Sequence, residues 1–286
     1  MRLVNISAVA VTLLVVFTSC GGSKKTGKPT ATVPGNWQST PIAIDGDSKD
    51  WPSPYPNYDS KAKLAYATSN DRKYIYITVE SGDELTQMKM LKGGMVVSID
   101  TGGGKEDPFS INYPLENNNV EMDVPQGSDG QKDGAVQFQK QLSQRIRKGI
   151  EGANQFTVDG FAGCNGGYMI NQTVPCGIKL KARLDEYREI VWEVAIPVKS
   201  LFNKDSLTAA DAGKQIGVCF SLKGTKAPKG QVQNANGGMN QMGGGGSRNA
   251  AAMGGPMAGG GKTSNPLEQL YSATKTRKQF SLVVQP

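Results

Sequence analysis

Three carboxylates lie close together near the start of the chain, at Asp45, Asp47 and Asp50. Carboxylate oxygens are the ligands that Ca²⁺ prefers, so this cluster could bind a calcium ion. The alternative is that these side chains cap the turn at Asp45-Gly46, because Asp hydrogen-bonds to its own turn and Gly supplies a positive φ. Turn capping is the commoner role for this pattern.

The chain contains no histidine, which limits the chemistry that it can perform. Catalytic arrangements of the Ser-His-Asp or Cys-His type are therefore excluded. No phosphate-binding loop of the Gly-x-x-x-x-Gly-Lys-Ser/Thr type occurs, and nothing singles out a carboxylate pair for glycoside hydrolysis. We therefore expect a non-catalytic protein with no cofactor, unless the three aspartates bind Ca²⁺.

The first residues form a targeting segment. The apolar run Ala8–Phe17 is shorter than the roughly 20 residues that span a bilayer, so it is typical of a signal peptide. Phe17-Thr18-Ser19-Cys20 resembles the lipobox of bacterial lipoproteins, which implies a signal peptide over 1–19 and acylation of Cys20. An ordinary secretory signal is the alternative.

Residues 20–38 are rich in Gly, Ser, Thr, Lys and Pro, and we expect a flexible tether. The tether is basic, whereas acidic residues after the lipidated Cys are a surface-export signal in some lipoproteins. The segment thus predicts a lipid-anchored outer-membrane protein that faces the periplasm.

Two of the remaining cysteines, Cys164 and Cys176, are close in the sequence. An exported protein meets an oxidising compartment, so we expect a disulfide between them, worth roughly 2–3 kcal/mol by loop entropy. A zinc site is disfavoured because it needs four N or S ligands and the chain has no histidine.

The formal net charge of +7 comes from Lys and Arg that are scattered along the chain. The largest clusters are at 145–148 and 275–278. A nucleic-acid interface needs a clustered patch together with a reading motif, and neither is present. We therefore expect no nucleic-acid partner.

Alternating apolar and polar residues predict that most of the chain is β-structure. The strongest signal is Tyr74–Val79, in which aromatic and β-branched residues alternate over two faces. The other expected strands are Ile42–Ile44, Leu64–Tyr66, Met95–Asp100, Phe109–Tyr113, Gln155–Gly160, Ile178–Leu184, Glu189–Ile196, Gln215–Leu222 and Gln279–Val284.

One short helix is predicted over Ala135–Ile150, where apolar residues recur every four positions. The segment 230–261 is rich in Gly and contains four Met and one charge, so we expect a disordered insertion rather than a domain boundary. Its methionines could bind Cu(I), although a low-complexity linker is the simpler interpretation. The expected domain is a single β-sandwich over 39–286.

The order of these motifs resembles the family 9 carbohydrate-binding modules and their DOMON-like relatives. The resemblance rests on IAIDGDSKDW at Ile42–Trp51, on the hairpin from Leu64 to Ile77, on Val96–Asp100, and on EIVWEVAIPVKSL at Glu189–Leu201. It implies an all-β fold, a jelly-roll-like sandwich of two antiparallel sheets. Some DOMON-like relatives hold haem, usually through Met and His, but this chain has no His.

Family 9 modules stack sugar rings on aromatic side chains, because the C–H faces of a pyranose pack well on π surfaces. By this resemblance the candidate ligand-binding residues are Trp51, Tyr55, Tyr58 and Tyr66. Trp192 shares the face of Ile190 and Val194, and we expect it in the core. The leading hypothesis is a glycan-binding envelope lipoprotein. The alternative is a structural component of the envelope that binds another protein through a sheet edge.

Overall fold

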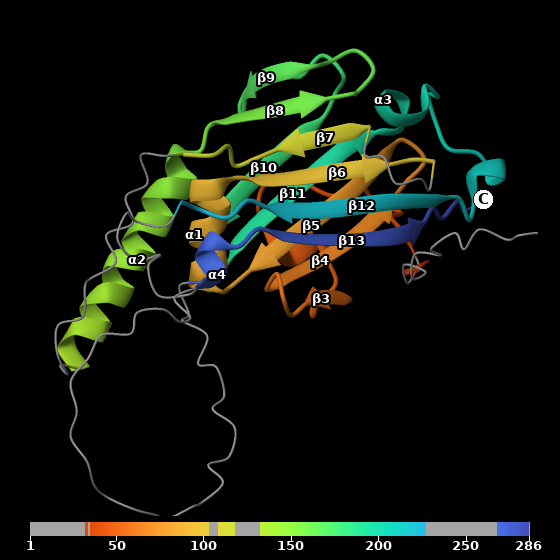
Figure 1. Ribbon diagram of the computed structural model, residues 1–286. Coiled ribbons are helices and arrows are strands. Elements are labelled where there is room, and N and C mark those ends of the chain that lie inside the picture. The colour runs from red at the N-terminus through yellow and green to blue at the C-terminus, as the bar shows by residue number, and fades with distance from the viewer. Residues whose placement is uncertain (1–31, 34, 103–107, 118–131, 227–267, 286) are drawn as a thin grey trace, which may run out of the picture.

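The fold is a sandwich of two mainly antiparallel β-sheets, as the sequence predicts (Figure 1). The computed structural model describes residues 32–33, 35–102, 108–117, 132–226 and 268–285. One sheet has seven strands in the order β1 (Thr32–Val33), β13 (Thr274–Ser281), β12 (Gln215–Leu222), β6 (Met95–Asp100), β7 (Phe109–Asn112), β8 (Gln155–Asp159) and β9 (Gly166–Met169). The six-stranded sheet has the order β10 (Lys179–Leu184), β11 (Ile190–Pro197), β5 (Tyr74–Ser81), β4 (Leu64–Asn70) and β2 (Asn36–Trp37), and β3 (Asn57–Asp59) pairs with β4. The pairs β1–β13 and β2–β4 are parallel.

The core between the sheets follows the period-2 alternation of the sequence. In β5, the inward residues Ile75, Ile77 and Val79 are buried. In β11, Trp192 is also fully buried, and its indole Nε1–H donates to the backbone oxygen of Tyr113 at 3.1 Å. Its expected place in the core is confirmed.

The predicted strand Ile42–Ile44 is wrong, because residues 41–44 belong to neither sheet. Their backbone donors bind side chains in place of a neighbouring strand. The Ala43 N–H donates to Asp50 Oδ2 at 2.9 Å, and the next turn is fastened to Glu193. The segment therefore lies on the outer face of the six-stranded sheet, where Ile42 and Trp51 form a second small apolar cluster.

Helices α1 (Glu84–Gly93), α2 (Lys132–Gly152) and α4 (Glu268–Tyr271) gather at one end of the sandwich, where Figure 1 shows them side by side. Helix α3 (Val198–Phe202) directly follows β11 and lies away from them in Figure 1. Helix α2 contains the predicted helix, and Leu142, Ile146 and Ile150 of its apolar stripe are buried. Helix α1 was not predicted. It is buried on nearly all sides, and its polar residues hydrogen-bond inside the protein, as Lys89 does to Thr274.

Several sequence predictions fall outside the part of the chain that the structure describes. These are the signal peptide, Cys20, most of the tether and the Gly/Met-rich insertion. Among the helices that the structure does describe, none is both long and apolar enough to cross a membrane.

Candidate functional site

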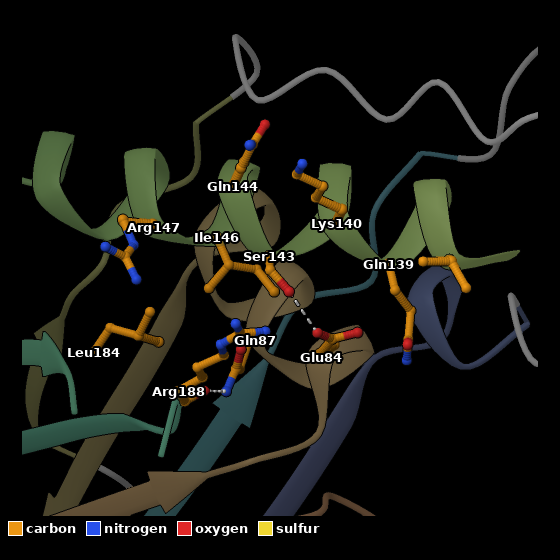
Figure 2. A pocket seen from close by; sticks show the side chains of 11 residues that line it. Glu84, Gln87, Gln139, Lys140, Ser143, Gln144, Ile146, Arg147, Leu184 and Arg188 are labelled. Carbon is orange, nitrogen blue, oxygen red and sulfur yellow. Dashed lines mark hydrogen bonds between the residues drawn. The ribbon is translucent and has the colours of Figure 1, made fainter. Parts of the chain in front are cut away.

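A groove runs beside α2 at the helical end of the sandwich. Its first part is a cavity of about 690 Å³ between α1, α2 and the turn that joins β10 to β11 (Figure 2). Its second part is a cavity of about 640 Å³ between α2, β10 and the ends of β7 and β9. Because Arg147 and Leu184 line both cavities, they are adjacent, and we call them together the α2 groove.

The sequence of α2 explains why this helix forms one wall. Its buried stripe, Leu142, Ile146 and Ile150, attaches it to the core. Ser143 and Arg147 are four residues apart, so they lie on one adjoining face and line the groove. The Ser143 hydroxyl donates to Glu84 Oε1 at 2.9 Å, which links α2 to the start of α1.

The opposite wall is held by Gln87 of α1. Its side-chain Nε2 donates to the backbone oxygens of Ser81 and Arg188, each at 2.7 Å. The first bond reaches the end of β5, and the second reaches the β10–β11 turn. This turn is therefore fixed to the same helix that α2 packs against, and the groove has supported walls.

The groove combines polar walls with an apolar surface, which is the usual composition of a small-molecule site. Val136 and Leu184 supply apolar atoms to the first cavity, and Gln139 and Ser143 supply hydrogen-bonding groups. Each cavity falls within the roughly 300–1,000 Å³ typical of ligand pockets. The arrangement can bind a molecule that has both hydroxyl groups and exposed C–H surface.

Two of the predicted ligand-binding aromatics are buried. Tyr66 is 1% exposed and packs against Phe220 with a ring-centroid distance of 5.0 Å, so it cannot form a surface platform for a sugar. Trp51 is 6% exposed, and its Nε1–H donates to Glu193 Oε1 at 2.6 Å. Both residues stabilise the sandwich, one inside the core and the other on the outer face of the six-stranded sheet.

The other two predicted aromatics lie toward the outer face of the six-stranded sheet. Tyr58 is 62% exposed and pairs with Ala65, whose other neighbour across the sheet is Glu80. Tyr55 is partly buried, and its hydroxyl lies 3.3 Å from Thr78 Oγ1. Burial raises the pKa of the Tyr55 hydroxyl well above its ordinary value. Tyr55 and Tyr58 are thus on a different part of the surface from the α2 groove.

Glu80 adds a titratable group to this outer face. Burial, followed by a hydrogen bond with the Glu189 carboxylate, raises the pKa of Glu80 to about 7. A second carboxylate in contact disfavours the charged form of a partly buried carboxyl group. The Glu80 carboxyl is in this situation, beside Glu189 at the end of β5.

The three aspartates are used as turn caps. Asp45 Oδ1 accepts from the Asp47 N–H at 2.9 Å, and Asp47 Oδ1 accepts from the Lys49 N–H at 3.2 Å. Asp47 Oδ2 also pairs with Arg183 at 3.2 Å. Within the described parts of the chain, no group of three acidic, Cys or His side chains is arranged to hold a metal ion. One carboxylate oxygen of each aspartate thus accepts a backbone N–H of this segment, from Ala43 in the case of Asp50, which is the turn-capping role.

The expected disulfide is present. Cys164 and Cys176 are bonded, with 5.4 Å between their Cα atoms, and close the loop that contains β9. Cys219 is buried in β12, on the side that faces away from the core, with its Sγ 3.7 Å from Ser221 Oγ.

Sequence reasoning missed the α2 groove. The one local signal was the polar stripe of Gln139, Ser143 and Arg147, which follows the apolar stripe of α2 at four-residue spacing. The other wall comes from α1 and from the β10–β11 turn, which are distant in the sequence. No local pattern connects these elements to α2.

Comparisons with known proteins identify similar structures but no family. No protein-family model matches the sequence, and no curated protein matches it. The structure is similar to a family 9 carbohydrate-binding module from Caldicellulosiruptor kristjanssonii in complex with glucose, at 8% identity and a TM-score of 0.33, covering 90% of this chain and 97% of that chain. It is also similar to a module of this family from the same organism in complex with cellotriose, at 9% identity and a TM-score of 0.35, covering 90% of this chain and 95% of that chain. The two-sheet sandwich itself is established by the strand pairing of this chain.

Proposed function

We propose that this protein is a non-catalytic, glycan-binding lipoprotein of the bacterial envelope, and that the α2 groove is its binding site. The observation that carries the proposal is the composition and size of the groove. The hydroxyl groups of a sugar hydrogen-bond to amide and hydroxyl side chains such as Gln139 and Ser143, while its C–H faces pack on Leu184. Two adjoining cavities provide room for more than one sugar ring.

The N-terminal sequence supports the cellular context. The apolar run followed by Cys20 favours cleavage and acylation at this residue, with the sandwich tethered to the outer membrane and facing the periplasm. Metabolic labelling with palmitate tests this part. Label should enter the wild-type protein and be lost in Cys20→Ser, and label that persists in Cys20→Ser would contradict the anchor.

A calorimetric and thermal-shift screen of the full chain tests the binding site. The screen uses soluble α- and β-linked oligosaccharides, both neutral and acidic. Leu184→Trp should abolish the response to any glycan that binds, because Leu184 lies where the two cavities adjoin. The control is Tyr58→Ala, which removes an exposed aromatic ring on the other surface.

Each result decides between the two surfaces. Binding that is lost in Leu184→Trp and kept in Tyr58→Ala supports the α2 groove. The reverse pattern moves the site to the outer face of the six-stranded sheet. A whole panel without any response rejects glycan binding.

A protein-binding role is the second candidate, and it is favoured by the position of β10. This strand ends the six-stranded sheet in the described part of the chain, and Lys181–Leu184 of β10 line the second cavity. An extended peptide can add to such an edge through main-chain hydrogen bonds. This role is preferred if the glycan panel gives no response and a partner from the envelope binds the wild-type chain but not Leu184→Trp.

A further inference from the structure

The first cavity of the α2 groove contains two arginine side chains that face the same space. Figure 2 shows Arg147 reaching down from α2 and Arg188 reaching up from the β10–β11 turn. Neither guanidinium forms an ion pair or a hydrogen bond with any side chain of the described residues. Both residues are exposed, so a ligand can reach them without displacing a protein partner.

The opposing charge in this cavity is small. Glu84 is its one carboxylate among the lining residues, and one of its oxygens already accepts the Ser143 hydroxyl. Lys140 also lines the cavity, but Figure 2 shows its ammonium group pointing away from the two arginines. The second cavity, which Arg147 also lines, balances its three cationic residues with three carboxylates: Arg147, Lys181 and Arg183 against Glu151, Asp185 and Glu186. The net positive charge is therefore concentrated at one end of the groove.

The backbone at Arg188 gives an independent reason to assign this side chain a role in binding. Its φ is +65°, in the left-handed region that Gly and Asn adopt more easily than other residues. The turn places Arg188 there through a bond from its N–H to the Asp185 oxygen at 3.2 Å. A glycine would satisfy the same turn with less strain. The arginine thus carries a conformational cost at the position where its side chain enters the cavity.

We infer that the α2 groove binds an acidic glycan, whose anionic group is held between Arg147 and Arg188. This inference rests on the proposed glycan binding and adds the chemical class of the ligand. Guanidinium groups bind carboxylates and sulfates through paired, charge-assisted hydrogen bonds, so both a uronic acid and a sulfated sugar present suitable chemistry. Leu184 then contacts the C–H surface of the adjacent ring.

Three trisaccharides of one backbone test the inference. They are cellotriose, its trimer oxidised to the carboxylate at each C6, and cellotriose sulfated at C6. We expect one of the acidic trimers, or both, to bind about tenfold or more tightly than cellotriose at low ionic strength, since charge-assisted bonds are stronger than neutral ones. The preference should decrease as salt is added. The two acidic arms distinguish carboxylate from sulfate.

Substitutions locate the anionic group. Arg147→Gln and Arg188→Gly should each reduce the preference for the acidic trimer, and the double variant should abolish it. Lys140→Gln is the matched control, because it removes a positive charge from the same helix on the side away from the two arginines. The urea concentration at the unfolding midpoint of Arg188→Gly should equal or exceed that of the wild type, because Gly adopts a positive φ easily. This measurement separates the effect of the variant on binding from any effect on folding.

The outcomes separate this inference from the proposed function. Equal affinity for all three trimers, or a preference that survives in the double variant, overturns the acidic-ligand inference and leaves glycan binding intact. A preference that Lys140→Gln reduces as much as Arg147→Gln overturns the assignment to the two arginines. If no trimer and no glycan of the wider panel binds, both proposals are rejected.

Discussion

The indole of Trp51 donates its Nε1–H to the Oε1 of Glu193 at 2.6 Å, and Glu193 is 0% exposed. The other carboxylate oxygen accepts the backbone N–H groups of Asp45 and Gly46, at 3.0 and 2.6 Å. Burial raises the pKa of Glu193, and the three donors oppose this effect by stabilising the charged form. One carboxylate thus fastens the irregular segment 42–51 to the outside of the six-stranded sheet.

Glu193→Gln should lower the free energy of unfolding by about 1–3 kcal/mol. The Gln amide nitrogen is a hydrogen-bond donor, and it would face N–H groups that now donate to the carboxylate. Trp51→Phe removes one of these donors and keeps most of the packing. Urea unfolding of both single variants and the double variant measures the coupling between the two side chains. We expect a coupling free energy above about 1 kcal/mol, since hydrogen bonds to charged groups are stronger than neutral ones. Additive effects would show that Glu193 acts without Trp51.

The sequence predicts the sandwich well where one face of a strand is apolar, as in β5 and β11. It fails where polar residues face inward. In β13, Thr274 and Thr276 are buried, and their alternation with Lys275 and Arg277 gives no apolar face to recognise. The predicted strand Gln279–Val284 is therefore wrong at both ends, because β13 is Thr274–Ser281. Helix α1 was missed because its buried residues include Gln87 and Lys89, which leaves no apolar stripe to recognise.

The candidate site was less predictable than the fold. Tyr66 is two residues after Leu64 in β4, so both side chains point to the same face of the strand. The burial of Tyr66 could therefore be predicted from the sequence. The burial of Glu193 could not, because it depends on a segment more than a hundred residues earlier that covers the outer face. The α2 groove likewise forms from elements whose contact is purely tertiary.

The Glu80–Glu189 pair predicts a pH dependence of stability. The folded state raises the pKa of Glu80 from 4.5 to about 7, so the unfolded chain releases a proton that the folded protein retains. The stability that this group contributes is present below pH 4.5 and is lost as the pH rises through about 7. Glu80→Gln keeps a donor to Glu189 without the charge. It should raise the unfolding free energy at pH 8 by about 1 kcal/mol, a modest value because the carboxyl is partly exposed.

Urea unfolding at pH 5 and pH 8 provides the measurement for this pair. The change in unfolding free energy between pH 5 and pH 8 should be smaller in Glu80→Gln than in the wild type. Glu186→Gln, on the exposed β10–β11 turn, is the control for removing a nearby carboxylate. If the unfolding free energy depends on pH equally in Glu80→Gln and in the wild type, the pKa of Glu80 is not raised in the folded state.

The disulfide should contribute measurably to stability. Replacing Cys164 and Cys176 together by Ala should lower the unfolding free energy by about 2–3 kcal/mol, because the short loop gains entropy in the unfolded chain. Reduction of the wild-type protein should cause a similar loss, which thermal unfolding with and without a reductant measures. A melting temperature that is insensitive both to reduction and to the double substitution would contradict this role.

Gly160 ends β8 at a point where the backbone leaves no room for a side chain. Its φ is +83°, and a Cβ added there would overlap the carbonyl oxygen of Pro108. Its N–H also donates to Asn165 Oδ1 at 2.8 Å, so the turn cannot move freely to relieve the contact. Gly160→Ala should therefore lower the free energy of unfolding by at least about 2 kcal/mol.

Gly152, at the end of α2, provides the control, because an added Cβ there meets nothing within 4 Å. Gly152→Ala should leave the stability unchanged or raise it by up to about 1 kcal/mol. Urea unfolding of the two variants decides the matter, and equal effects would mean that the β8–β9 hairpin tolerates a change of its turn.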